Sequence, residues 1–394
     1  MKSRKIIDFS KKVMMLVGIN PTVFKGKVNG FLGRNVITNY FDTKYEKKAL
    51  ISYIIVPFQN HQNDNVHQNF WQAREMARIV SNKGYDVDII PYYDPYVHLK
   101  KKYDLVIAQF PKDVDCFSNN IKENAIKIAY LTTSSPEFNN AAELSRIDQM
   151  EKRRGVRLEP LRQIPELTDD FYSYDAFFVM GNETTLSTYK GINKNCFLIK
   201  NHTNAIDCSI DVNKKKSNNF MFIGSVGQVH KGLDILLEIF SEEGFPCNLY
   251  VLGAYKNERE FYEFYDIELN YTKNIFSEGF VDISSSKFKE LSEKCSYMIM
   301  PSCSEGMAGS VLDAMAGGVI PIVSKNCGYD EEDGAVILDN CDAETIRSFI
   351  ISYSKKPLDW IIEKCQKEVE IARVKYSREQ YTKSLEEAFD FLKL

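Results

Sequence analysis

An apolar segment that runs into a loop of small residues is the stretch of this chain best suited to chemistry. Residues 297–300 are apolar, the loop after them contains Glu305, and an alanine-rich helix is expected to begin after Gly309. A helix that begins there directs unpaired backbone N–H groups and the positive end of its dipole outward, which suits a phosphate. Glu305 would then accept hydrogen bonds from sugar hydroxyls. The alternative is an ordinary strand–loop–helix unit of an α/β protein.

A second candidate element opens the second half of the chain. Residues 220–224 are expected to form a strand, a glycine-containing loop follows, and Lys231-Gly232 is expected to open an amphipathic helix. A lysine at that helix start would supply a positive charge for a diphosphate, beside backbone N–H groups. The alternative is a solvated lysine.

Together these two elements resemble the donor-sugar motifs of retaining GT-B glycosyltransferases of family four. In that family, Gly-Arg is followed by Lys-Gly, and later a Glu is followed after seven residues by a second Glu. This chain has Ser225 in place of the Arg and Asp313 in place of the second Glu. We expect His230, or an Arg from the first domain, to replace the missing cation.

The resemblance implies a role for each motif residue. Glu305 and the N–H groups of residues 307 and 308 would bind sugar hydroxyls, those of residues 309 and 310 the phosphates, and Asp313 the ribose. The segment 276–281 resembles the loop that touches the nucleobase. Glu305 and Lys231 are the expected catalytic residues, with His67. The residues expected to bind the donor are Ser225, His230, Lys231, Phe280, Val281, Glu305, Met307, Ala308, Gly309, Ser310 and Asp313.

In the first half, the loop 59–69 follows the first expected strand and is far more polar than a connector needs. We expect it to bind acceptor or donor hydroxyls through Asn65 or His67; the alternative is that these are turn and helix-cap residues. The family often places a His after its fourth strand, but residues 131–136 contain none. Ser134, Ser135 or His67 would take its place, or catalysis is impaired.

A basic patch at residues 151–157 and Arg162 lies between a long expected helix and the next strand. Arg154 and its neighbours would hold an anionic acceptor such as a lipid phosphate, or complete the missing diphosphate grip; the alternative is a solvated helix end. No Cys-x-x-Cys pair or His/Cys cluster is present, so no metal is predicted. Gly-x-Gly-x-x-Gly is absent as well, and no cofactor is expected because the nucleotide-sugar is a substrate.

Composition sets wider limits. The 394 residues suit two domains, and a net charge of −4 gives no reason to expect a nucleic-acid partner. Nine cysteines indicate reduced thiols and a cytoplasmic protein. No apolar run is long enough to span a bilayer. The first 40 residues carry eight Lys or Arg and one Asp. This segment would lie on an anionic membrane surface, such as the inner face of the plasma membrane, or pack on the first domain.

From residue 49, apolar runs of strand length alternate with helix-length segments, as in parallel α/β sheets. We predict two Rossmann-like domains facing a cleft, the GT-B architecture, with a C-terminal helix crossing back onto the first. The domains are expected at residues 1–48 (basic extension), 49–205, 206–357 and 358–394 (helical segment). Strands are predicted at residues 49–58, 85–91, 103–110, 126–132, 174–180, 196–200, 220–224, 249–253, 276–281, 297–300, 319–323 and 335–338. Helices are predicted at residues 66–83 and 137–154, and from near 231, 258, 285, 309, 343 and 358.

The sequence therefore predicts a metal-independent retaining glycosyltransferase of the hexosyltransferase type. It would move a sugar from a nucleotide-diphosphate donor to a hydroxyl acceptor, namely a carbohydrate or a lipid-linked or protein-linked glycan, in surface polysaccharide or glycoconjugate synthesis. Three alternatives stay open: a non-catalytic GT-B subunit of a glycosyltransferase complex, a GT-B nucleotide-sugar 2-epimerase, and a plain carbohydrate-binding protein.

Overall fold

The computed structural model describes residues 35–59, 67–92, 97–109, 117–192, 194–204 and 210–394. The chain packs as two compact units: residues 1–62, 69–130 and 168–176 form the first, and residues 63–68, 131–167 and 177–394 form the second. Asn65 and the first 34 residues of the basic extension lie outside the described residues, as does part of the expected junction, residues 205–209. The expected domain boundaries stay predictions.

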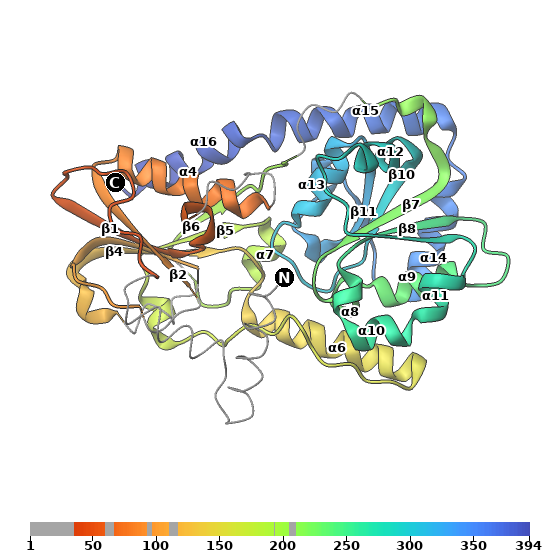
Figure 1. Ribbon diagram of the computed structural model, residues 1–394, viewed down its shortest axis with the longest axis horizontal. Coiled ribbons are helices and arrows are strands. Elements are labelled where there is room, and N and C mark those ends of the chain that lie inside the picture. Colours follow the sequence, from red (N-terminus) through yellow and green to blue (C-terminus); the bar gives the residue numbers. More distant parts are fainter. Residues whose placement is uncertain (1–34, 60–66, 93–96, 110–116, 193, 205–209) are drawn as a thin grey trace, which may run out of the picture. The chain divides into compact units, whose positions relative to one another are not determined.

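Two six-stranded parallel sheets form the framework (Figure 1), which confirms the predicted pair of Rossmann-like domains. The first has the order β2-β1-β3-β4-β5-β6. In it, Ala49 of β1 lies opposite Val87 of β2 and Leu105 of β3. Its strands are β1 (Lys47–Tyr53), β2 (Tyr85–Pro91), β3 (Tyr103–Ala108), β4 (Ile121–Leu131), β5 (Ala176–Met180) and β6 (Asn195–Ile199). The helices along this part of the chain are α3 (Val56–Gln59), α4 (Gln68–Asn82), α6 (Pro136–Arg154) and α7 (Glu183–Ser187).

The second sheet has the order β12-β11-β10-β7-β8-β9. Its central strand β10 is buried along its whole length, as expected of a parallel strand covered on both faces. Its strands are β7 (Lys216–Gly224), β8 (Asn248–Gly253), β9 (Ile275–Gly279), β10 (Cys295–Met300), β11 (Ile320–Ser324) and β12 (Val336–Leu338). Figure 1 shows α12, α13 and α15 on one face of this sheet and α9 and α14 on the other. The helices of this part are α8 (Gln228–Lys231), α9 (Leu233–Phe240), α10 (Arg259–Phe264), α11 (Asp266–Tyr271), α12 (Ser286–Lys294), α13 (Gly309–Ala316), α14 (Ala343–Ser354), α15 (Leu358–Lys375) and α16 (Arg378–Phe391).

The last helix returns to the first sheet, as predicted. Helix α16 packs against β6 of that sheet. The Phe389 ring meets Phe178 of β5 edge-on at 5.2 Å between ring centroids, and Phe391 meets Phe197 of β6 at 5.3 Å. Edge-to-face pairs of this kind add to the burial of apolar surface, so aromatic packing fixes the end of the chain.

Two element predictions are wrong in detail. The strand predicted at 49–58 stops at Tyr53, and Val56–Gln59 form the short helix α3 instead. Pro57 has no N–H to donate to a strand ladder, which ends the pairing. Lys231 does not open a helix but ends α8, because Gly232 has a left-handed φ of 82° that separates α8 from α9.

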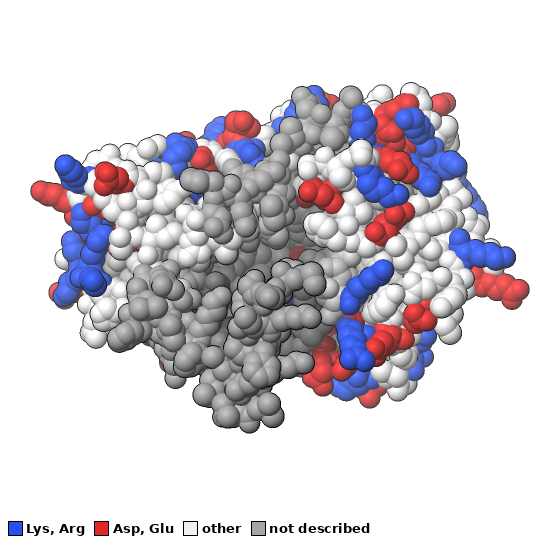
Figure 2. Space-filling view, viewed as in Figure 1, with Lys and Arg blue, Asp and Glu red and all other residues white. Residues whose placement is uncertain are grey.

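No helix among the described residues is both long and apolar enough for a transmembrane span. Over the second unit, on the right of Figure 2, basic and acidic residues are interspersed on the face shown. Charges mixed in this way give no broad field of one sign on that face.

Gly232 connects this fold to the candidate site. A Cβ atom at Gly232 would lie 2.6 Å from Cγ of Pro301 and 3.0 Å from its carbonyl oxygen, whereas one at Gly244, which also has a left-handed φ of 74°, would meet nothing within 4 Å. We expect Gly244→Ala to lower the free energy of unfolding by about 1 kcal/mol from backbone strain. Gly232→Ala should cost about 2–4 kcal/mol, because overpacking adds to that strain. Urea denaturation of both variants checks this. Equal losses would contradict the close packing of α8 against Pro301.

Candidate active site

Two loops of the second sheet meet at one edge. Strands β7 and β10 are parallel neighbours, so the loops after Gly224 and after Met300 leave the same end of the sheet. In open α/β sheets, ligands bind beyond the carboxyl ends of the strands. The site predicted from the motifs therefore has the position that this fold gives to ligand sites.

The loop from Pro301 to Ala308 is held in place by its backbone. The N–H of Cys303 donates to the His230 carbonyl at 2.9 Å, and the N–H of Glu305 donates to the Asn326 carbonyl at 2.9 Å. Close approach of the chain needs Gly306, where a Cβ would lie 2.3 Å from the Thr132 carbonyl oxygen. The loop is therefore a fixed platform for the Glu305 side chain.

A buried ion pair joins the two loops. The Lys231 ammonium contacts Oε1 of Glu305, and the two residues are only 6% and 7% exposed. Ser302 Oγ donates to the same carboxylate oxygen at 3.1 Å, and Arg162 Nη2 lies 3.5 Å from Oε2. The structure thus brings both expected catalytic residues of the motifs into direct contact.

Glu305 is ionised at neutral pH. Burial by itself would raise the pKa of Glu305, but Lys231 and then Arg162 outweigh it and lower the pKa to about 2. An ionised carboxylate accepts hydrogen bonds and donates none. Glu305 is therefore suited to hold hydroxyl groups or to balance positive charge, and it is not suited to deliver a proton.

His230 is buried beside this pair as a neutral ring. Its Nε2 lies 2.5 Å from the Ser304 carbonyl oxygen, so Nε2 carries the proton. Burial lowers the pKa of His230 to about 4. A neutral imidazole brings no positive charge, so this histidine does not fit the expected role of replacing the missing cation.

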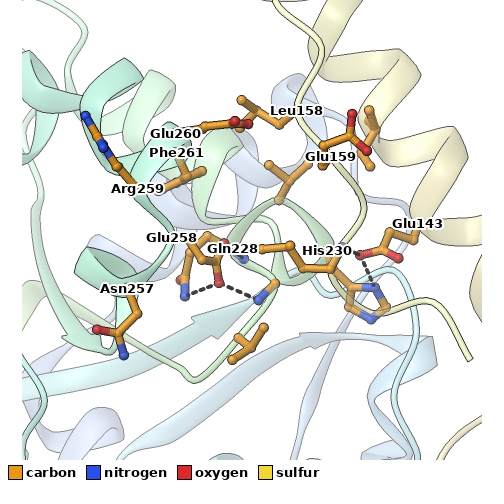
Figure 3. Close-up of a pocket in the computed structure, with 15 residues that line it drawn as sticks. Glu143, Leu158, Glu159, Gln228, His230, Asn257, Glu258, Arg259, Glu260 and Phe261 are labelled. Atoms are coloured by element: carbon orange, nitrogen blue, oxygen red, sulfur yellow. Dashed lines mark hydrogen bonds and ion pairs between the residues drawn. The ribbon is translucent and has the colours of Figure 1, made fainter. Parts of the chain in front are cut away.

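A cavity of about 450 Å³ is lined in part by residues of α8, and Figure 3 shows its lining. Apolar side chains of Ile147, Leu158, Val229 and Phe261 form much of it. His230 also lines this cavity, with Nδ1 3.8 Å from Oε1 of Glu143. Lys231 and Glu305 are not among the residues that line this cavity.

The start of α13 faces the same region. Ala308 is its N-cap residue and has no oxygen with which to cap the helix, while the N–H of Ala308 already donates to the Cys327 carbonyl at 3.1 Å. Met307 is buried, and its carbonyl accepts from Asn201 Nδ2 at 2.9 Å. Gly309 and Ser310 are half-buried at the first turn. Phosphate binding by their N–H groups stays a prediction, and Ala308 would have to exchange its partner to bind a sugar.

Asp313 is already bonded within the protein. Its Oδ1 accepts from Thr203 Oγ1 at 3.1 Å and from the Asn204 N–H at 3.0 Å, and its Oδ2 accepts from Gln68 Nε2 at 3.1 Å. A carboxylate offers about four acceptor positions, and three are in use. Ribose binding by Asp313 stays a prediction that requires a ribose hydroxyl to share or displace these donors.

Other expected site residues lie apart from the pair or serve the fold. Ser134 is close, since its Oγ donates to the Glu305 carbonyl at 2.7 Å, but Ser135 caps α6 by accepting from the Phe138 N–H. Arg154 is not brought to the site. It pairs with Glu268 at 2.9 Å and lies over the Phe264 and Tyr265 rings.

The remaining candidates are at the surface. Phe280, in the loop after β9, is 79% exposed, and Val281 beside it is half-buried. Ser225 and His67 are also exposed. Their expected roles toward a ligand stay predictions. Asn65 lies outside the described residues.

Sequence reasoning missed the residues that surround the motifs. Ser302 and Asn201 contact the motif residues directly, and Thr203 and Asn204 hold Asp313. The polar run 201–204 follows strand β6 directly, which is the same signal that singled out the loop 59–69. Polar residues that follow a strand could therefore have pointed to Asn201, Thr203 and Asn204.

A comparison with protein-family models finds a match to the part of the chain that forms the second sheet. Residues 217–367 match the family model described as glycosyl transferases group 1, and this stretch contains Lys231, Glu305 and Asp313. No curated protein sequence matches the chain significantly.

Solved structures share the fold of the whole chain. Sucrose-phosphate synthase from Thermosynechococcus elongatus has a TM-score of 0.57 and 11% identity, covering 88% of this chain and 98% of its own. Anabaena HepE with UDP and glucose has a TM-score of 0.54 and 10% identity, covering 88% and 99%. S. aureus TarM has a TM-score of 0.51 and 14% identity, covering 73% of this chain. The chain spans 55% of the length of TarM. The fold is therefore GT-B, with two Rossmann-like domains.

The buried pair makes a testable contribution to stability. The pKa of Glu305 is lowered from 4.5 to about 2, so its ionised form stabilises the fold above pH 4.5, and this is lost as the pH falls toward 2. We expect Glu305→Gln to lower the free energy of unfolding by on the order of 3 kcal/mol at pH 7, and by less at pH 3. Urea denaturation at both pH values measures this difference. The matched control is Glu242→Gln at an exposed pair with Arg347, which should change stability by less than about 1 kcal/mol. A difference independent of pH would contradict the assigned ionisation.

Proposed function

We propose that this chain, which has the GT-B fold and a glycosyl transferases group 1 match over residues 217–367, is a retaining glycosyltransferase. It would transfer a hexose from a nucleotide-diphosphate sugar to a hydroxyl of a carbohydrate acceptor. The observation that carries the proposal is the buried Lys231–Glu305 pair at the carboxyl ends of β7 and β10, beside the start of α13.

This pair supplies the two functions that sugar transfer from a diphosphate requires. The bond between the anomeric carbon and the diphosphate oxygen breaks, and the leaving diphosphate takes the electron pair while the acceptor hydroxyl attacks. Negative charge therefore develops on the diphosphate, where Lys231 and the N–H groups at Gly309 and Ser310 would stabilise it. Glu305, kept ionised by its neighbours, would hold the donor-sugar hydroxyls and so orient the anomeric carbon.

The same arrangement supports a metal-independent reaction without a cofactor. Cationic side chains, Lys231 foremost, would balance the charge of the diphosphate in place of a metal ion. Among the described residues, no group of three or more His, Cys, Asp or Glu has metal-binding geometry. We therefore assign charge stabilisation to this chain's own side chains and backbone.

The substrates are proposed by class. The TarM and HepE structures contain UDP, so a UDP-sugar is the first donor to test. A carbohydrate, or a lipid-linked or protein-linked glycan in surface polysaccharide or glycoconjugate synthesis, would be the acceptor. Contact of the basic N-terminal segment with an anionic membrane surface belongs to the same proposal, because it would bring the enzyme to a lipid-linked acceptor.

A non-catalytic GT-B subunit is the second candidate. Asp313 is held by Thr203, Asn204 and Gln68, and Ser225 stands where the family has an Arg, so part of the donor site departs from the family pattern. Such a subunit would bind nucleotide weakly and turn over none. A 2-epimerase, in contrast, would release nucleoside diphosphate without any acceptor.

Thermal-shift screening identifies the donor. The chain is mixed with UDP-, GDP-, ADP- and dTDP-sugars, because a ligand that binds the native state raises the melting temperature by mass action. We expect one base to give a clear rise, and hydrolysis or transfer to release its nucleoside diphosphate. No shift with any of the four would contradict the proposal.

Single substitutions test the assigned roles. We expect Lys231→Ala and Glu305→Ala each to lower the transfer rate by at least about 100-fold, as for the loss of one preorganised stabilising group. Lys214→Ala is the matched control, because the Lys214 side chain is 60% exposed and pairs with Glu293. Melting curves establish that each variant is folded before its rate is measured. Near-wild-type rates in both folded variants would remove these role assignments.

A further inference from the structure

A segment that follows α6 carries Arg162 to the Lys231–Glu305 pair. We call residues 155–167 the strap. Side chains of α6 hold its backbone: Asn139 Nδ2 donates to the Arg162 carbonyl at 2.7 Å, and Glu143 Oε1 accepts from the Arg162 N–H at 2.9 Å. The Asn139 and Glu143 side chains are buried, so they form hydrogen bonds with the strap and not with water. The backbone on each side of the Arg162 side chain is therefore fixed.

The next residues of the strap are fixed in the same way. Asn140 Nδ2 donates to the Ile164 carbonyl at 2.8 Å, and Asn140 Oδ1 accepts from the Ile164 N–H at 2.8 Å. Helix α6 is itself bound to the β10 loop, since Arg146 Nη2 donates to the Pro301 carbonyl at 2.9 Å. A rigid chain of contacts thus links the β10 loop, α6 and Arg162.

The Arg162 side chain crosses the loop that contains Ser225. A Cβ added at Gly227 would lie 2.6 Å from Cγ of Arg162, so only glycine leaves room for this path. The guanidinium ends 3.5 Å from Oε2 of Glu305, and 26% of the side chain is exposed. Arg162 therefore reaches from the strap to the site while keeping access to a ligand.

The guanidinium of Arg162 lies farther from its carboxylate partner than those of the neighbouring arginines do. Arg153, Arg154 and Arg157 contact carboxylates at 2.5, 2.9 and 2.5 Å, whereas Arg162 has its one described carboxylate contact at 3.5 Å. With His230 neutral, Lys231 and Arg162 together exceed Glu305 by one positive charge. A guanidinium presents a fork of donors that matches phosphate oxygens.

We propose that Arg162, positioned by the strap, binds the diphosphate of the donor in place of the arginine that Ser225 does not provide. This inference rests on the proposed function and goes beyond it, because it takes the second cation from a different part of the chain. On binding, the diphosphate draws the guanidinium away from Glu305 Oε2, and that oxygen becomes an acceptor for the donor-sugar hydroxyls.

Calorimetric titration with UDP, or with the nucleoside diphosphate found by thermal shift, tests the proposal. We expect Arg162→Ala to weaken nucleoside diphosphate binding by about 10- to 100-fold, the loss of charge-assisted hydrogen bonds to an anion. Binding of the nucleoside alone should change less than twofold, which a general loss of structure would not allow. Arg157→Ala, on the same strap and paired with Asp148 and Glu151 at the surface, is the matched control and should bind as the wild type does.

A rescue variant makes the test specific. Ser225→Arg in the Arg162→Ala background should restore at least half of the lost affinity on a logarithmic scale, because it returns a guanidinium to the neighbouring loop. If the wild type binds a nucleoside diphosphate and Arg162→Ala binds it equally well, the inference is overturned while the proposed function stands. If the wild type binds none, both are overturned.

Discussion

The buried ion pair of Lys231 and Glu305 is the constraint on which the rest of the site depends. Removing two charges from water is costly, and their attraction offsets this only if the remaining positions of both groups are also satisfied. Ser302 and Arg162 contact the carboxylate oxygens of Glu305. The loops after β7 and β10 must then keep their relative positions so that the Lys231 ammonium stays beside Glu305. The pair therefore binds the two loops to each other, as well as offering charge to a ligand.

Close packing of backbone around the pair follows from this requirement. A Cβ at Gly328 would lie 1.9 Å from the Gly306 carbonyl oxygen, and one at Gly306 would lie 2.3 Å from the Thr132 carbonyl oxygen. Carbonyl oxygens can approach this closely only where side chains are absent. Water is thereby kept from the pair, which strengthens its electrostatic attraction. The small residues around Glu305 are thus needed for the electrostatics of the site, in addition to forming the turn.

The sequence predicts the structure of residues that are contiguous in the chain, but not the contacts between residues that are far apart in it. The alternation of strand-length and helix-length segments predicts both sheets. The motif around Glu305 predicts the strand, loop and helix because their residues are contiguous. The contacts of Arg162 with Gly227 and Glu305 depend on how α6 packs against α8, which no local periodicity encodes. The position of Lys231 is an example, within a single loop, of what the sequence pattern does not predict. Its place at the end of α8 follows from the left-handed conformation of Gly232, which a helical pattern alone does not reveal.

Glu305 and Asp313, the two acidic residues of the motif, have very different surroundings. Glu305 is surrounded by cations and keeps its charge at low pH, whereas Thr203, Asn204 and Gln68, which donate to Asp313, are neutral. Lys231, Asp313 and the Ala308 N–H each have a protein partner before any ligand arrives. Donor binding is then an exchange of partners, so its free energy depends on the difference between the old and new contacts. A diphosphate carries more charge than one carboxylate. The exchange therefore favours the diphosphate most at Lys231 and Arg162.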